Sequence, residues 1–114
     1  IPQVYYVGLL AGKNDLKLLE ETKEGRNINR HYYSNEEIAE EVQRPVVKSL
    51  LNLFSFRNQS EAFDLEGTIE IEIPTAHSIV IKRQNKDKSV TAVAEIDLQS
   101  QTYQVLENGR KIQF

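Results

Sequence analysis

The second half of the chain alternates apolar and polar residues with a period of two, and this pattern constrains the fold more than any other. Ile69, Ile71 and Ile73 alternate with glutamates, and residues 90–98 alternate in the same way. Between them, residues 78–84 form a further strand-like run. Successive side chains of a strand point to opposite faces of a sheet. The alternation therefore predicts strands with one buried face and one solvated face.

Short turns join these predicted strands. Pro74 should end the first strand, and a polar turn follows the second. The last two runs, over residues 102–107 and 111–114, flank Asn108-Gly109, the strongest two-residue hairpin signal. Strands connected in this way predict a small, five-stranded antiparallel β domain.

Helical signals precede the strands. Residues 15–22 have the composition of a short helix, and Ser34 followed by Glu37 forms a capping-box pattern that begins another. Pro45 should end that helix and open a longer one, in which apolar residues recur at helical spacing. This apolar stripe consists of Val46, Val47, Leu50, Leu51, Leu53 and Phe54.

Composition narrows the classes of function. The 114 residues are 39% hydrophobic and 27% charged with a net charge of −3, which suits a globular chain and offers no basic footprint for nucleic acid. No apolar run approaches the roughly 18 residues of a membrane span. Cysteine is absent, and the glycines form no phosphate-binding loop. We expect a cytoplasmic protein with no cofactor, no metal, no nucleic-acid partner and no membrane contact.

Residues 25–33, Gly-Arg-Asn-Ile-Asn-Arg-His-Tyr-Tyr, concentrate the chemistry of the chain. Two arginines, two asparagines, a histidine and two tyrosines occur there, with Ile28 as the single aliphatic residue. Guanidinium groups bind pairs of oxygen atoms, while Asn, His and Tyr add mixed donors and flat faces. The set suits a sugar or a small anion. A polar surface loop with ordinary ion pairs is the alternative.

Several motifs together resemble a known enzyme family. They are Ile1-Pro-Gln-Val-Tyr-Tyr-Val-Gly8, Gly12-Lys-Asn-Asp-Leu16, the stretch 25–33, Arg44-Pro-Val-Val-Lys48, Leu53-Phe-Ser-Phe-Arg57 and Ser60-Glu-Ala-Phe-Asp64. The chain resembles the C-terminal part of the sucrose phosphorylases, bacterial enzymes of the α-amylase-like glycoside hydrolase family 13. The resemblance covers essentially the whole chain.

The resemblance implies an α+β fragment of a larger enzyme. Residues 1–63 would be the end of a catalytic (β/α)₈ barrel, with the last strand in residues 1–10, the active-site rim loop over 11–33 and closing helices. Residues 64–114 would be the C-terminal antiparallel β domain. A complete barrel needs about 250 residues, so this chain of 114 cannot contain one.

The implied reaction is a retaining transfer of glucose from sucrose to phosphate, which yields glucose 1-phosphate and fructose. The family's catalytic Asp and Glu would lie upstream, so no catalytic residue is expected here and the fragment should be inactive. By the resemblance, Arg30 would hold the outer hydroxyls of the bound glucose, with Arg26 as second choice. Asn14 and Asp15 would lie near the mouth of the site.

Other functions stay open at this point. A sister phosphorylase could act on glucosylglycerate or sucrose 6′-phosphate, and the chain could instead be a sugar-binding β module or a structural interaction domain. A longer parent reading frame would discriminate between them. Sucrose and phosphate are the partners expected for the intact enzyme. The isolated chain should self-associate through residues 1–33 or hold that segment in a conformation unlike a barrel strand, since a barrel strand there would lack its neighbours.

Overall fold

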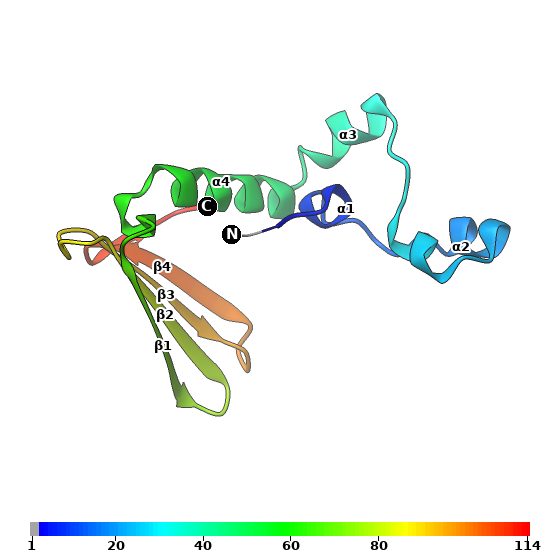
Figure 1. Cartoon of the computed structure of the whole chain (residues 1–114). Helices are drawn as coiled ribbons and strands as arrows, with labels where there is room; N and C mark the ends of the chain where they lie inside the picture. Colours follow the sequence, from blue (N-terminus) through cyan, green and yellow to red (C-terminus); the bar gives the residue numbers. More distant parts are fainter. Residues whose placement is uncertain (1–2) are drawn as a thin grey trace. The chain divides into compact units, whose positions relative to one another are not determined.

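The structure is a computed structural model that describes residues 3–114. The chain forms two compact units, one that extends to Phe54 and includes Phe114, and another that comprises Ser55–Gln113. Helices make up the first unit, and the second contains the sheet (Figure 1). The boundary that we expect between functional domains, after residue 63, stays a prediction.

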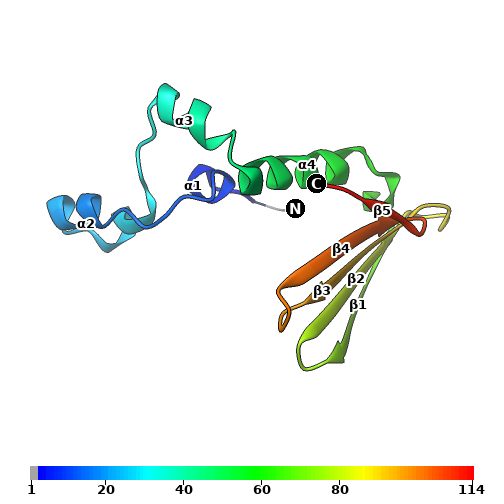
Figure 2. The same ribbon diagram turned by 180° about the vertical axis from the view of Figure 1, so that it is seen from behind.

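The second unit contains a five-stranded antiparallel sheet with its strands in chain order (Figures 1 and 2). The strands are β1 (Thr68–Thr75), β2 (Ser78–Gln84), β3 (Thr91–Asp97), β4 (Thr102–Glu107) and β5 (Arg110–Ile112). In the last hairpin, φ is +47° at Asn108 and +79° at Gly109, as a two-residue turn of this kind requires. The predicted antiparallel sheet is confirmed.

Pro74 lies inside β1 and does not end it. The register between β1 and β2 shifts after Glu72, and pairing resumes between Thr75 and Ser78. Because β1 is an edge strand, a residue without an N–H group can be accommodated where no neighbour needs that donor. The strand end that we expected at Pro74 is therefore wrong.

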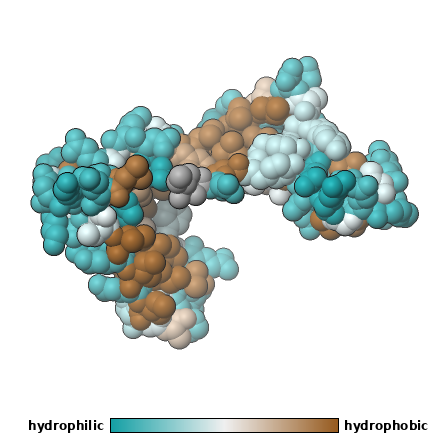
Figure 3. All heavy atoms as spheres, viewed as in Figure 1, coloured by the Kyte–Doolittle hydropathy of each residue, from teal (hydrophilic) through white to brown (hydrophobic). Residues whose placement is uncertain are grey.

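Most apolar residues of the sheet share one face, although Val80, Val93 and Leu106 lie on the other. The mainly apolar face is buried unevenly. Ala92 and Val105 are buried, with 3% and 7% of their surface exposed, whereas Ile69, Ile71 and Ile73 in β1 are 56%, 61% and 72% exposed. Figure 3 shows hydrophobic surface gathered over the sheet. An edge strand has a neighbour on one side only, so its side chains find fewer packing partners.

The helices predicted over residues 15–22, after Ser34 and from Pro45 are present, together with helical elements that were not predicted. In chain order, the helical elements are α1 (Tyr6–Leu9), α2 (Leu16–Thr22), η1 (Gly25–Asn29), α3 (Asn35–Glu41), α4 (Pro45–Gln59) and η2 (Glu61–Phe63), where η marks a 3-10 helix. Both hydrogen bonds of the capping box between Ser34 and Glu37 are present at the start of α3. Pro45 is the first residue of α4, where its missing N–H costs nothing. No helix within residues 3–114 is long and apolar enough to cross a bilayer.

The barrel strand predicted in residues 1–10 is wrong over the described part of that segment. Residues 6–9 form α1, with a hydrogen bond from the N–H of Leu9 to the carbonyl of Tyr5 at 2.9 Å, and residues 1 and 2 lie outside the described residues. A strand must pair with another strand, and the strands within residues 3–114 all pair in the antiparallel sheet. Local helical bonds satisfy this backbone instead. The remnant of a barrel is not confirmed.

Candidate functional site

His31 lies at the centre of the polar residues of the first unit. Its Nδ1 atom is 2.7 Å from Oδ2 of Asp15, and its Nε2 atom is 3.3 Å from Oε1 of Glu37. Asp15 immediately precedes α2 and Glu37 belongs to α3, so one imidazole ring joins three segments. We call Asp15, His31 and Glu37 the histidine bridge.

Each carboxylate of the histidine bridge uses its other oxygen to cap a helix. Oδ1 of Asp15 accepts a hydrogen bond from the N–H of Leu18 at 2.9 Å, in the first turn of α2. Oε2 of Glu37 accepts one from the N–H of Ser34 at 2.7 Å, within the capping box of α3. The histidine bridge therefore links the N-terminal ends of two helices through one ring.

In the histidine bridge, each charged group stabilises the opposite charge beside it. The hydrogen bond with Asp15 raises the pKa of His31, partial burial opposes this, and the contact with Glu37 raises the pKa further. The bond with His31 is the main cause that lowers the pKa of Asp15. The pKa of Glu37 is lowered first by the N–H of Ser34 and then by His31. Each group thus favours its charged form.

Aromatic groups fix the backbone and the ring of His31. The hydroxyl of Tyr6 donates to the carbonyl oxygen of His31 at 2.8 Å, and the Tyr33 ring meets the imidazole edge-on with centroids 4.5 Å apart. Gly12 allows this arrangement, because a Cβ atom there would collide with the Tyr33 hydroxyl and lie 2.8 Å from Cγ1 of Val7. The position therefore has no room for a side chain.

A groove of about 850 Å³ opens beside the histidine bridge. Its lining consists of Gly12, Lys13, Asn14, Asp15, Leu16, Lys17, His31, Tyr33, Glu37, Glu40, Glu41 and Arg44. Within residues 3–114 no group of three or more His, Cys, Asp or Glu residues is placed to hold a metal ion.

The sequence-predicted site residues separate into two sets. Asn14 and Asp15 line the groove, whereas Arg26 and Arg30 do not. Nε of Arg26 donates to Oε2 of Glu24 at 2.8 Å, so this guanidinium already has an acidic partner. The exposed side chain of Arg30 has no hydrogen bond or ion pair with any residue in 3–114.

Asn27 braces the loop from within. It is 9% exposed, and its Nδ2 donates to the Thr22 hydroxyl at 3.0 Å. The part played by His31 was missed, because its partners lie 16 residues before it and 6 residues after it. The available signal was the position of both carboxylates at helix starts, which leaves one oxygen of each free for a further donor.

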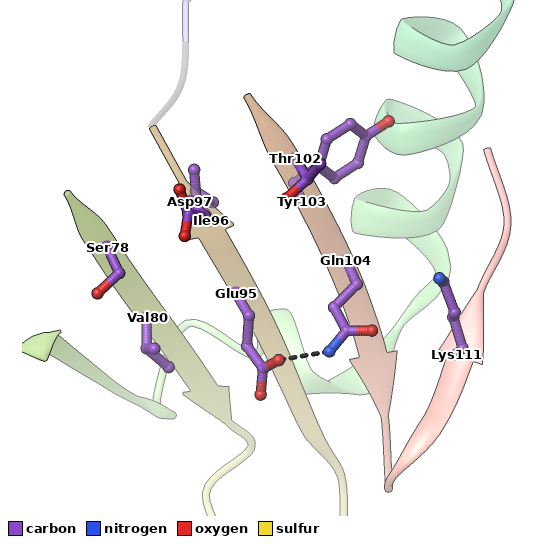
Figure 4. Close-up of a pocket in the computed structure, with 9 residues that line it drawn as sticks. All are labelled: Ser78, Val80, Glu95, Ile96, Asp97, Thr102, Tyr103, Gln104 and Lys111. Atoms are coloured by element: carbon purple, nitrogen blue, oxygen red, sulfur yellow. Dashed lines mark hydrogen bonds between the residues drawn. The ribbon is translucent and has the colours of Figure 1, made fainter. Parts of the chain in front are cut away.

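A second groove, of about 430 Å³, crosses β2, β3, β4 and β5 (Figure 4). Within it Gln104 donates a hydrogen bond to Glu95, and Lys111 and Asp97 also contribute to the lining. The N–H of Ser100 is the main cause that lowers the pKa of Asp97. This cause is a local turn contact, so the groove carries the features of a solvated sheet face.

Comparison with known proteins identifies relatives of this chain. No family model matches the sequence. A sucrose phosphorylase of Streptococcus mutans is 72% identical over 114 residues, which covers 100% of this chain and 24% of that protein. The chain is related to the sucrose phosphorylases over its whole length. A sucrose phosphorylase of Bifidobacterium adolescentis is 64% identical over 91 residues, covering 80% of this chain and 18% of that protein.

A solved structure agrees with this relationship. The crystal structure of a sucrose 6F-phosphate phosphorylase from Thermoanaerobacter thermosaccharolyticum matches with a TM-score of 0.87 and 43% identity, over 100% of this chain and 23% of that one. The resemblance to the sucrose phosphorylases, stated from motifs alone, is confirmed. The chain spans about a quarter of the length of the relatives it matches.

Proposed function

We propose that this chain is the C-terminal part of a sucrose phosphorylase that transfers glucose from sucrose to phosphate with retention, giving glucose 1-phosphate and fructose. The observation that carries the proposal is the 72% identity to a sucrose phosphorylase over all 114 residues. The carboxylates that perform the chemistry lie upstream of this chain. Its own contribution is to hold the sugar.

Arg30 is the sugar-binding residue in this proposal. Its guanidinium is exposed and has no partner within residues 3–114, while that of Arg26 is paired with Glu24. A free, planar guanidinium can bind two vicinal hydroxyls, or a carboxylate and a hydroxyl, in a bidentate manner. Asn14, in the groove, is a further candidate for contact with substrate. Both carboxylate oxygens of Asp15 are already engaged, so we assign Asp15 a supporting part.

The test uses the full-length enzyme and measures the release of glucose 1-phosphate from sucrose and phosphate. Arg30→Ala should lower kcat/KM by about a hundredfold or more, because loss of a bidentate clamp releases the sugar from its reactive position. Arg26→Ala, a matched loss of one exposed guanidinium from the same loop, should change it less than about threefold. Equal effects of the two substitutions would remove Arg30 from the site.

A sister phosphorylase is the second candidate. A sucrose 6(F)-phosphate phosphorylase of Thermoanaerobacterium thermosaccharolyticum is 44% identical over 115 residues, and a glucosylglycerol phosphorylase of Marinobacter adhaerens is 41% identical over 111. Both values lie well below 72%. The full-length enzyme should therefore prefer sucrose when sucrose, sucrose 6′-phosphate and glucosylglycerol are supplied separately with phosphate. A higher kcat/KM for either of the other two would favour the sister activity.

A further inference from the structure

We propose that His31 is a positioning residue for Arg30, which it acts on through the charged histidine bridge to Asp15 and Glu37. The inference rests on the proposed role of Arg30 in sugar binding.

Counting protons shows which form of His31 the contacts require. An ionised carboxylate has no proton to donate, and a neutral imidazole has one N–H group. Oxygen atoms of Asp15 and Glu37 lie 2.7 Å and 3.3 Å from the two ring nitrogens. Both contacts can be hydrogen bonds together only when the ring is an imidazolium that donates from both nitrogens.

The histidine bridge leaves little freedom to the backbone that carries Arg30. On one side, the N–H of Arg30 donates to the carbonyl of Asn27 at 3.1 Å, and Asn27 is itself buried. On the other side, the carbonyl of His31 accepts from Tyr6 and its ring is held at both nitrogens. A guanidinium without protein partners thus projects from a fixed base, as a substrate-holding group requires.

The charges around His31 come from several elements. Asp15 faces it from the start of α2, Glu37 from α3, and the phenols of Tyr6 and Tyr33 contact its carbonyl and its ring. The same groove also holds Lys13, Lys17, Glu40, Glu41 and Arg44. The two direct carboxylate partners raise the pKa of His31, so the histidine bridge should weaken only as the pH rises beyond the ordinary histidine range of about 6.5.

A double-mutant cycle in the full-length enzyme separates positioning from general structural support. In the enzyme that keeps Arg30, His31→Gln should lower kcat/KM for sucrose by about tenfold to a hundredfold, because the guanidinium of Arg30 is misplaced. In the Arg30→Ala background the same substitution should cost less than about twofold. An equal loss in both backgrounds would overturn the proposal. If Arg30→Ala itself has no effect, the proposed function of Arg30 fails instead.

The pH profile gives an independent measurement. The wild-type enzyme should lose kcat/KM above about pH 6.5 more steeply than His31→Gln, since Gln cannot titrate. His31→Asn places an amide near the Nδ1 position, where it can donate a hydrogen bond to Asp15. This variant should therefore retain more activity than His31→Gln. His77→Gln, in the turn between β1 and β2, is the control and should leave the profile unchanged. Superimposable wild-type and His31→Gln profiles would overturn the proposal.

Thermal unfolding of each variant checks that it folds. If the His31 variants do not fold, Glu37→Gln provides the same comparison, with Glu36→Gln on the adjacent exposed position as its control. Glu37→Gln should lower kcat/KM only when Arg30 is present, and a loss independent of Arg30 would overturn the proposal.

Discussion

His31 couples the stability of the first unit to pH, because a carboxylate faces each of its two ring nitrogens. Its pKa is raised in the folded chain, so its contribution is complete below the ordinary value of about 6.5 and is lost as the pH rises through the raised value. The pKa values of Asp15 and Glu37 are lowered in the folded chain. Both carboxylates therefore stabilise the fold above their ordinary pKa values of about 4, and this stabilisation is lost as the pH falls through the lowered values. The histidine bridge is strongest between these limits.

We therefore expect the first unit to be most stable between about pH 4.5 and pH 6.5 and to unfold at lower temperature as the pH rises further. Near-UV circular dichroism of tyrosine reports on this unit, because four of the five tyrosines precede Ser34. His31→Gln should flatten the decline above pH 6.5, and His77→Gln should not. A decline that persists in His31→Gln would show that another group causes it.

Among the elements, α4 shows how burial differs within a single apolar stripe. Val47 is completely buried, whereas Val46 is 52% exposed and Leu51 is 39% exposed. Helical spacing alone places all three among the apolar positions, yet only Val47 is fully buried. The neighbouring valines therefore form a matched pair, since both occupy the first turn and have the same helix propensity.

Val47→Ala should lower the free energy of unfolding by roughly 1.5–2.5 kcal/mol, from the lost transfer of buried methyl groups and the cavity left behind. Val46→Ala should change it by less than about 0.5 kcal/mol, as is usual for surface positions. Urea denaturation of both variants beside the wild type measures the difference. Equal losses would mean that Val46 is covered in solution.

At the scale of the whole chain, apolar side chains remain exposed in both units. In the first unit Val4 and Tyr5 are 50% and 49% exposed, and in the second the three β1 isoleucines are 56–72% exposed. Exposed apolar surface favours association. Edge pairing of two β1 strands is disfavoured, since alternating Glu70 and Glu72 would bring like charges together and Pro74 lacks a donor.

We expect the isolated chain to self-associate through residues 1–33, as predicted from the sequence. Light scattering should give a mass above that of one 13.1 kDa chain. Substituting Val4 and Tyr5 with Ser should restore the monomer, while substituting Ile69, Ile71 and Ile73 with Thr should not. The reverse result would assign association to the sheet, and a monomeric wild type would contradict the prediction.

Prediction succeeded at two features whose determining contacts are local in sequence. The capping box spans four residues from Ser34 to Glu37, and the hairpin depends on two residues, Asn108 and Gly109. Prediction failed at Pro74, where strand position in the sheet decided whether a proline is tolerated. In the candidate site, the roles of Arg30 and Asn14 stay predictions.

The sequence by itself determined the antiparallel strands, their alternation, the helix starts and the relationship to sucrose phosphorylases, because each depends on short motifs or on side-chain periodicity. Only the tertiary structure decided that Tyr6–Leu9 are helical and that His31 is held between Asp15 and Glu37. The physical reason is the same in both cases. A strand needs a neighbour and an imidazolium needs two acceptors, and folding alone determines whether distant residues supply them.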